Sequence, residues 1–475
     1  MTFERLWTVP GSMLLVVALT PAVPASGQAA PGTPKARSDS TLSVAAVGDA
    51  LIRGRVAQLD DSRDPAFQRM AEVIRGADAA FVNLEGSVLR FSDFTGWPAA
   101  EHGGYWQVSP PEVAEDLKAM GFDLFNTANN HTADWGAEGL RMTNETLDRL
   151  GLVHAGSGMN LGEASRPGYL DTFEGRVALI GLATTFSPSS RAGAARGEVM
   201  GRPGLNALRV DRTYEADSAT YNMLLALAPR VQGQVPTAPG APLRIFGVAV
   251  SLGQETHLIE RVNTQDEERI LREIRNASKM ANYVIVTSHS HEPGNQYETP
   301  PPWLREFMKK CIDAGATTYI VHGPHRLRGI EMYQGRPLFY SVGNFIYHEE
   351  LWDVLPADQY DVFDLPETAL PFDFHNARFQ GGTVGAPANP AYYQSVIAIP
   401  VFRGPRMIEL RLHPIDLGQH AARPQRGTPR LADAATGRQI IEEIARLSAP
   451  FGTSIVYEGG IGVWRASPKA SPQER

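Results

Sequence analysis

The chain has 475 residues, of which 43% are hydrophobic and 20% are charged, a balance typical of a soluble globular protein. This length exceeds that of an average domain but fits one large α/β domain with insertions. The formal net charge of −8 disfavours nucleic acid and anionic membrane surfaces as partners.

The first residues have the pattern of a secretory signal peptide. Arg5 supplies a positive charge, residues 11–20 form an apolar run too short to span a membrane comfortably, and small residues follow it. We therefore predict a signal peptide over 1–29, a flexible linker over 30–41 and a secreted or periplasmic protein; an uncleaved anchor is the alternative. The single cysteine, Cys311, excludes an internal disulfide, and its helical surroundings predict buried packing.

From residue 42 onward, apolar β-branched runs alternate with segments of helical spacing. Strands are predicted over 42–49, 78–85, 122–131, 176–184, 282–289 and 316–323. Helices are predicted over 64–77, 109–121, 136–151, 265–281 and 301–315. This alternation is typical of an α/β fold with helices packed on the faces of a sheet.

The pattern changes in the later part of the chain. The segments 327–345 and 392–415 each contain two apolar runs around a Gly-containing turn, which indicates hairpins and a partly antiparallel sheet. One more helix is predicted within 427–452.

Two long segments, 186–242 and 348–390, lack periodicity and are rich in Pro, Gly and Ala. We predict that they are irregular surface insertions, a kind of loop that often covers a functional site. No internal repeat or strong domain boundary is visible. The sequence therefore predicts one domain over 42–420 that carries both insertions, with 421–475 as its C-terminal helix and extension.

Polar side chains recur where the predicted strands end. Ligands of open α/β sheets bind beyond the carboxyl ends of the strands, so side chains at these positions converge. The residues concerned are Asp49, Glu85, Asn130, His131, His289, His291, His322 and His325. A single polar residue after a strand is usually a turn or a cap, but this whole set is a mixed oxygen and nitrogen shell that suits divalent first-row metals. Because the set is too large for one tetrahedral ion, we predict two divalent ions (Mn, Fe or Zn) that share a carboxylate.

Distinctive stretches of sequence surround these residues. They read AVGDALIRGRV, FVNLEGSV, NTANNHTADWGAEGL, HSHEP and VHGPHRLRGIEMYQGRPLFYSVGNFIY, within 42–186 and 263–347. In content and order they resemble the CapA family, which is named for poly-γ-glutamate capsule synthesis and belongs to the calcineurin-like metallophosphoesterase superfamily. The resemblance implies a metallophosphatase-like fold, a four-layer αββα sandwich with mixed sheets and helices on the outer faces.

The resemblance also implies roles for individual residues. The implied ligands are Asp49 and His325 for a first metal, Asn130, His289 and His322 for a second metal, and Glu85 as the bridging carboxylate, where relatives outside the family usually have Asp. His131 resembles a histidine that contacts substrate and acts as a general acid. Asp134 would then orient the His131 ring.

The sequence departs from the superfamily pattern at two places. The first motif of the superfamily is Asp-x-His, but here the third position is Leu51. The first metal site therefore has one protein ligand fewer, or has water in that ligand's place. The last motif is His-x-His, whereas two residues separate His322 from His325. His291 could replace His289 or His322 as a ligand, could bind substrate, or could be an ordinary loop histidine.

Arg202 is a further candidate for substrate binding. It lies in GRPGLN within the first insertion, and a guanidinium there suits an anionic substrate group. The alternative is a Pro-Gly turn with an exposed arginine.

Three functions fit these observations. The first is a secreted hydrolase in which a dinuclear metal centre activates water for attack on a phosphoester or γ-glutamyl-type bond, in capsule or poly-γ-glutamate synthesis. The second is a non-catalytic accessory protein that binds metal and helps the envelope polymer-synthesis machinery to export or tether an anionic polymer. The third is a metal-assisted isomerase that acts on a peptide carboxylate. Fold and motif alone do not separate these functions.

Overall fold

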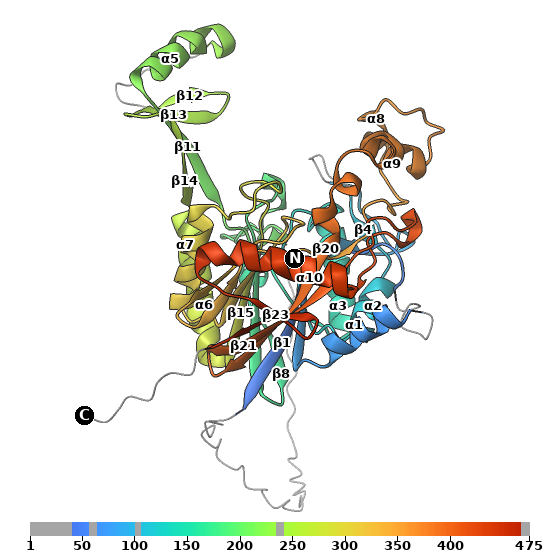
Figure 1. Cartoon of the computed structure of the whole chain (residues 1–475). Helices are drawn as coiled ribbons and strands as arrows, with labels where there is room; N and C mark the ends of the chain where they lie inside the picture. The colour runs from blue at the N-terminus through green and yellow to red at the C-terminus, as the bar shows by residue number, and fades with distance from the viewer. Residues whose placement is uncertain (1–39, 57–63, 100–105, 234–241, 467–475) are drawn as a thin grey trace, which may run out of the picture. The chain divides into compact units, whose positions relative to one another are not determined.

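The computed structural model describes residues 40–56, 64–99, 106–233 and 242–466 (Figure 1). The predicted signal peptide, and all but the last two residues of the predicted linker, lie outside these ranges. The described residues belong to one compact unit. None of the helices among them is both long and apolar enough to cross a membrane.

The largest sheet is built around β1 (Thr41–Leu51), an apolar strand that is buried along almost its whole length. Its strand order is β23 (Val456–Glu458), β24 (Ile461–Arg465), β21 (Arg406–Asp416), β20 (Gln394–Arg403), β1, β2 (Ala79–Leu84), β5 (Leu124–Asn126) and β6 (Val153–Ala155), with β19 (Asn344–Tyr347) also paired to β1 and β22 (Arg430–Leu431) to β21. β1 runs parallel to β2 and β19 but antiparallel to β20. The sheet is therefore mixed, as the hairpin patterns predict.

A second large sheet is also mixed. Its order is β17 (Ile330–Tyr333), β18 (Arg336–Phe339), β16 (Thr318–His322), β15 (Tyr283–His289), β9 (Gly175–Ala183) and β8 (Gly168–Thr172). β15 is parallel to both β9 and β16, whereas β17 and β18 form a hairpin. There are also three smaller sheets. The first has the order β12 (Leu243–Ile245), β13 (Val248–Leu252), β11 (Val210–Ala216) and β14 (His257–Val262). The other two are the pairs β10 (Gly204–Leu205) with β7 (Ser157–Gly158), and β3 (Ser87–Val88) with β4 (Val108–Ser109).

Helices and sheets share three large hydrophobic clusters. The helices of the described residues are α1 (Pro65–Arg75), α2 (Glu112–Ala119), α3 (Gly136–Arg149), α4 (Leu161–Ser165), α5 (Ser218–Gln232), α6 (Thr264–Met280), α7 (Pro302–Asp313), α8 (Ala357–Asp361), α9 (Pro371–Phe379) and α10 (Ala434–Ser448). Val47 on one face of β1 clusters with α1 and α2, and Val44 on the other face clusters with Leu179 of β9 and with α10. Ile180 of β9 clusters with α6 and α7, including the buried Cys311 thiol. The α/β class predicted from the sequence is confirmed.

Two predicted elements are shorter than their sequence patterns suggest. The strand predicted over 122–131 ends at Asn126, whose side-chain amide donates to the carbonyl oxygen of Ala128 at 2.8 Å as the chain leaves the sheet. The helix predicted from Ser109 begins at Glu112, because Ser109 belongs to β4. The loop after Asn126 is therefore free to carry site residues.

The prediction of two irregular insertions is wrong in detail. The first segment contains β11 and α5, and its small sheet continues past residue 242 to β14. α5 packs Tyr221, Leu224, Leu225 and Ala228, which have helical spacing, against the small sheet, and the sequence analysis missed this stripe. The second segment contains α8 and α9, and Phe374 of α9 is buried in the cluster that also contains α1.

Gly48 is required where β1 and β19 meet. A Cβ atom at Gly48 would lie 1.8 Å from the carbonyl oxygen of Gly343, too close for any side chain. We expect Gly48→Ala to displace β19 and to lower the free energy of unfolding by about 1–3 kcal/mol, the usual range for overpacking. Gly54→Ala is the control, because a Cβ there meets nothing within 4 Å. Urea denaturation measures both variants, and equal losses would contradict the close approach.

Candidate metal centre

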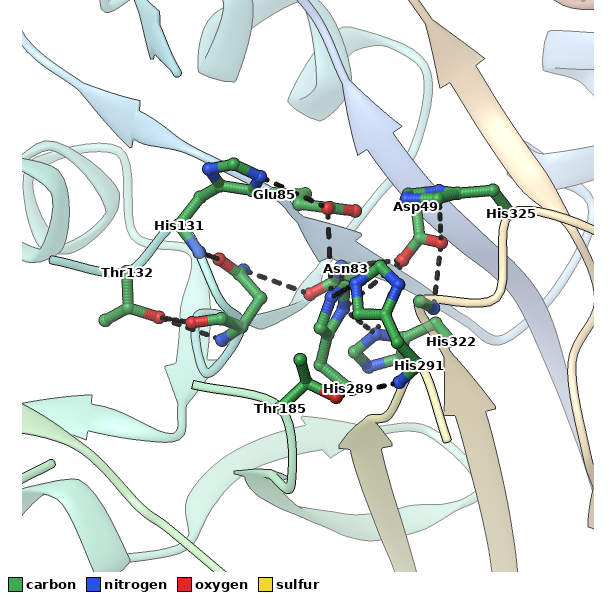
Figure 2. Close-up of polar contacts among 12 residues, drawn as sticks. Asp49, Asn83, Glu85, His131, Thr132, Thr185, His289, His291, His322 and His325 are labelled. Carbon is green, nitrogen blue, oxygen red and sulfur yellow. Dashed lines mark hydrogen bonds and ion pairs between the residues drawn. The ribbon is translucent and has the colours of Figure 1, made fainter. Parts of the chain in front are cut away.

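The polar residues at the strand ends lie together between the two large sheets (Figure 2). His289 and His322 end the parallel strands β15 and β16 and are direct partners in the register. Asp49 lies in β1 where the pairing register shifts against both β2 and β19. Such irregularities turn a side chain out of the regular pleat. The fold thereby brings an acid of one sheet to the histidines of the other.

Three groups of side chains could each hold a metal ion. They are Asp49 with His289 and His322, Glu85 with His289 and His291, and Asp49 with Glu85 and His325, and the ligand atoms of each group lie within 4.8 Å of one another. The groups overlap at Asp49, Glu85 and His289. Shared ligands of this kind suit neighbouring ions better than separate sites.

Asp49 is fully buried and well supplied with donors. Its Oδ1 accepts a hydrogen bond from Asn83 Nδ2 at 2.8 Å, and its Oδ2 accepts one from the backbone N–H of Gly323 at 2.9 Å. Burial would raise the pKa of Asp49, but hydrogen bonds with His322 and His325 and further charges hold the pKa well below its usual range. This environment favours the ionised form of the Asp49 carboxylate.

Glu85 has the opposite environment. It is 2% exposed, and neither carboxyl oxygen has a hydrogen-bond partner in the described part of the chain. Burial and the nearby Asp49 charge raise the pKa of Glu85 well above its usual range. A buried carboxylate without a donor is costly, and a cation is the group that would stabilise it. This donor set therefore fits a divalent metal ion.

The loop after β5 presents Asn130 and His131 to the same place. The Oδ1 atom of Asn130 is buried and lacks a hydrogen-bond partner among the described residues. The Nδ1 atom of His131 lies 2.6 Å from Asp134 Oδ2, which also accepts a hydrogen bond from the Gln107 backbone at 2.9 Å. His131 Nε2 is 3.9 Å from Glu85 Oε1. Asp134 thus holds the His131 ring with Nε2 near the centre.

The remaining histidines are packed ring to ring. His289 Nδ1 lies 3.1 Å from His322 Nδ1, and His289 Nε2 lies 3.0 Å from His291 Nε2. Burial and the neighbouring His291 lower the pKa of His289 well below its usual value, and burial and His325 lower the pKa of His291 to about 4. Both rings are therefore neutral, which is the form that binds metal ions.

His325 is held in a strained backbone conformation. Its φ of 56° lies in the left-handed region, which costs a residue other than glycine about 1–3 kcal/mol. Its Nδ1 atom lies 2.8 Å from Asn344 Oδ1, an acceptor, so Nδ1 carries the proton of this hydrogen bond. Burial would lower the pKa of His325, but contact with Asp49 raises it. This strained backbone conformation orients the His325 ring toward Asp49.

A cavity of about 360 Å³ opens onto this centre. It is lined by Glu85, Asn130, His131, His291 and His325 together with residues that the sequence interpretation missed: Gln107, Asn295, Tyr347, Glu349, Arg378 and Tyr392. Asn83, which supports Asp49, was also missed. An amide inside the otherwise apolar run AAFVNL was the available signal for Asn83.

Arg202 is not brought to this cavity. Its side chain is exposed, and its Nε donates to the carbonyl oxygen of Arg191 at 2.8 Å. The prediction that Arg202 binds substrate is therefore not supported by its position. The arginine that lines the cavity is Arg378, from the second insertion.

The structure thus defines a mixed α/β protein with overlapping carboxylate and histidine groups at its strand ends that could hold metal ions. The chain belongs to the bacterial capsule synthesis protein family PGA_cap, whose model matches residues 43–349. The family resemblance seen in the motifs is thus confirmed.

Individual relatives agree with this family. An uncharacterized protein of Sinorhizobium fredii, y4sH, is 39% identical over 432 residues, which cover 89% of this chain and 93% of that protein. The PGA biosynthesis protein CapA of Bacillus subtilis is 25% identical over 67% of each chain. The capsule biosynthesis protein CapA of Bacillus anthracis is 23% identical over 66% of this chain and 62% of that protein.

Divalent metal is expected to stabilise the folded chain, because the unfolded chain cannot hold these ligands together. After chelator treatment, Mn²⁺ or Zn²⁺ at 100 times its dissociation constant should raise the free energy of unfolding by about 2.7 kcal/mol. Chemical denaturation with and without the metal measures this increase.

The matched variants for this experiment are Glu85→Gln and Glu292→Gln. Glu85→Gln should remove most of the increase. Glu292→Gln should keep it, because Glu292 lies outside the ligand groups and accepts hydrogen bonds from the hydroxyls of Thr184 and Thr185 at 2.8 and 2.9 Å. An unchanged response in Glu85→Gln would show that Glu85 does not bind the metal.

Proposed function

We propose that this protein is a secreted, metal-dependent hydrolase that cleaves a phosphoester or γ-glutamyl-type bond. The observation that carries this proposal is the placement of His131. This histidine lines the cavity, is oriented by Asp134 at 2.6 Å and points Nε2 toward the Glu85 carboxylate, which accepts no hydrogen bond from the described residues. A histidine positioned in this way suits proton transfer to a group bound at the centre.

We further propose a dinuclear centre within a four-layer αββα sandwich. The cluster shared by β1, β9 and α10, and the helices that cluster with the other face of each large sheet, support that layering. Asp49, Glu85 and His325 would hold the first ion, for which Leu51 provides no ligand. The proposed ligands of the second ion are Glu85, Asn130, His289 and His322. His291 groups with Glu85 and His289 and also lines the cavity, so it can serve the metal or the substrate.

The chemistry of the chain's own residues follows from this arrangement. Divalent ions bound at such a centre lower the pKa of water and polarise an acceptor oxygen. His131, whose Nδ1 is held by Asp134, presents Nε2 to the cavity and can pass a proton from that atom to the leaving oxygen or nitrogen. Glu85 and Asp49 balance the positive charge of the ions.

The biological setting rests on the relatives and on the N-terminal pattern. The Bacillus relatives are named for capsule and PGA biosynthesis. We therefore propose an envelope polymer, or a small phosphorylated or γ-glutamyl precursor of one, as substrate, and the polymer-synthesis machinery as partner. The predicted signal peptide supports a secreted or periplasmic location.

Substitutions at His131 and Asp134 test the hydrolase. We expect His131→Ala to lower kcat by about 10²–10⁴-fold, the usual contribution of a general acid. Asp134→Asn should lower it by about 10–100-fold, since it only orients the ring. Elemental analysis should find the metal content unchanged in both variants. Turnover is measured on bis-(p-nitrophenyl) phosphate and γ-glutamyl-p-nitroanilide, with the exposed Arg202→Ala as the control that keeps the rate.

Other outcomes would favour the other functions. Binding of metal and anionic polymer without cleavage of either compound, unaffected by His131→Ala, would indicate an accessory protein. Incorporation of solvent deuterium beside a peptide carboxylate, without bond cleavage, would indicate an isomerase.

A further inference from the structure

The cavity has a second wall that the candidate metal ligands do not form. Glu349 follows strand β19, and Arg378, Phe379 and Tyr392 come from the second insertion and the residues after it. The match to the family ends at residue 349, so nearly all of this wall lies beyond the part of the chain that defines the family. Differences in this wall can therefore change what the site binds without changing the centre.

Arg378 supplies the fixed positive charge of this wall. It is the only lysine or arginine among the described residues that line the cavity. Its Nη2 lies 3.3 Å from Glu349 Oε1, and its guanidinium lies 5.3 Å from the centre of the Phe379 ring. The side chain is 26% exposed, so a solute in the cavity can reach it.

The helix that carries Arg378 is firmly attached. Phe374 of α9 is fully buried, and His375 Nε2 lies 2.9 Å from the carbonyl oxygen of Trp352. Arg423 donates to Asn376 Oδ1 at 2.9 Å. The guanidinium of Arg378 is thus presented from a fixed platform, which reduces the entropy lost when it binds a ligand.

The charges of the cavity define what Arg378 can recognise. Glu85 and Glu349 both line the cavity, so a substrate oxyanion that lies away from the proposed metal ions needs a cation of the chain beside it. A guanidinium binds a carboxylate or a phosphate through two parallel hydrogen bonds. The contact with Glu349 at 3.3 Å is longer than a strong charge-assisted hydrogen bond.

We propose that Arg378 is a specificity-determining residue that binds a second oxyanion of the substrate, a carboxylate or phosphate apart from the group under attack. This inference rests on the proposed function, because it assigns a substrate class to the same site. A polymer unit or precursor that carries a free carboxylate or phosphate next to its scissile bond has this chemistry. Tyr392, stacked near His325 with ring centres 5.9 Å apart, forms a flat side of the same space.

Equilibrium binding of matched probes tests the proposal. Glutarate and glutaramate differ in one carboxylate, and propane-1,3-diol bisphosphate and its monophosphate differ in one phosphate. Calorimetry on the full metal-loaded chain should show that the doubly anionic member of one pair binds about 10-fold more tightly or better, as expected for a charged hydrogen-bonded contact. The pair with the larger ratio identifies the carboxylate or the phosphate as the group that Arg378 binds.

Three variants decide the result. Arg378→Gln should reduce the ratio to about one, and Arg378→Lys, which keeps the charge but loses the planar fork, should give an intermediate ratio. Arg426→Gln should keep the full ratio, because Arg426 pairs with the adjacent Glu350 and has a similar exposure of 22% but does not line the cavity. Each measurement is accompanied by a thermal melt.

The possible failures are distinct. The proposal is overturned if the unaltered protein shows no preference in either pair, if Arg378→Gln keeps the preference, or if Arg426→Gln loses it equally. A preference that depends on Arg378, in a protein that cleaves neither chromogenic compound, supports Arg378 and rejects the hydrolase. Cleavage of a chromogenic compound without such a preference supports the hydrolase and rejects the proposed role of Arg378.

Discussion

Repulsion between two buried carboxylates is the constraint on which the site depends. Asp49 receives an amide, a backbone N–H and the neighbouring histidines, whereas Glu85 receives no donor from the described residues. The described residues therefore donate hydrogen bonds to Asp49, whereas Glu85 depends on a ligand from outside the chain. Burial and the nearby Asp49 charge raise the pKa of Glu85, and a cation between the two acids would offset their repulsion.

The two large sheets contribute different kinds of side chain to this site. The first sheet and its loops provide the oxygen atoms, through Asp49, Glu85 and Asn130. The second sheet provides neutral imidazoles, through His289 and His322 at adjacent strand ends. Because the hydrophobic cluster between β1 and β9 fixes the separation of the sheets, packing far from the centre determines how closely oxygen and nitrogen atoms approach each other.

The sequence predicted that the polar residues at the strand ends lie close together, because parallel strands follow simple rules. The runs at 282–289 and 316–323 are apolar along their length and end in histidine, and neighbouring parallel strands present their ends at one edge. The second wall of the cavity could not be predicted in this way. Arg378 and Glu349 meet only through tertiary packing, and α9 has no clear amphipathic pattern. That Arg202 does not line the cavity could not be seen either, because a loop position does not reveal which side of the molecule the loop faces.

The division of candidate ligands between two sheets also has a consequence for how a metal ion would be acquired. Neither sheet alone assembles a full set of candidate ligands, so high affinity would arise only after both sheets have docked. An ion would then be captured late, from whatever pool surrounds the chain at that moment. Because intrinsic affinities favour copper and zinc over manganese and iron, the compartment in which folding finishes, and not the ligand set alone, would decide which ion the protein holds.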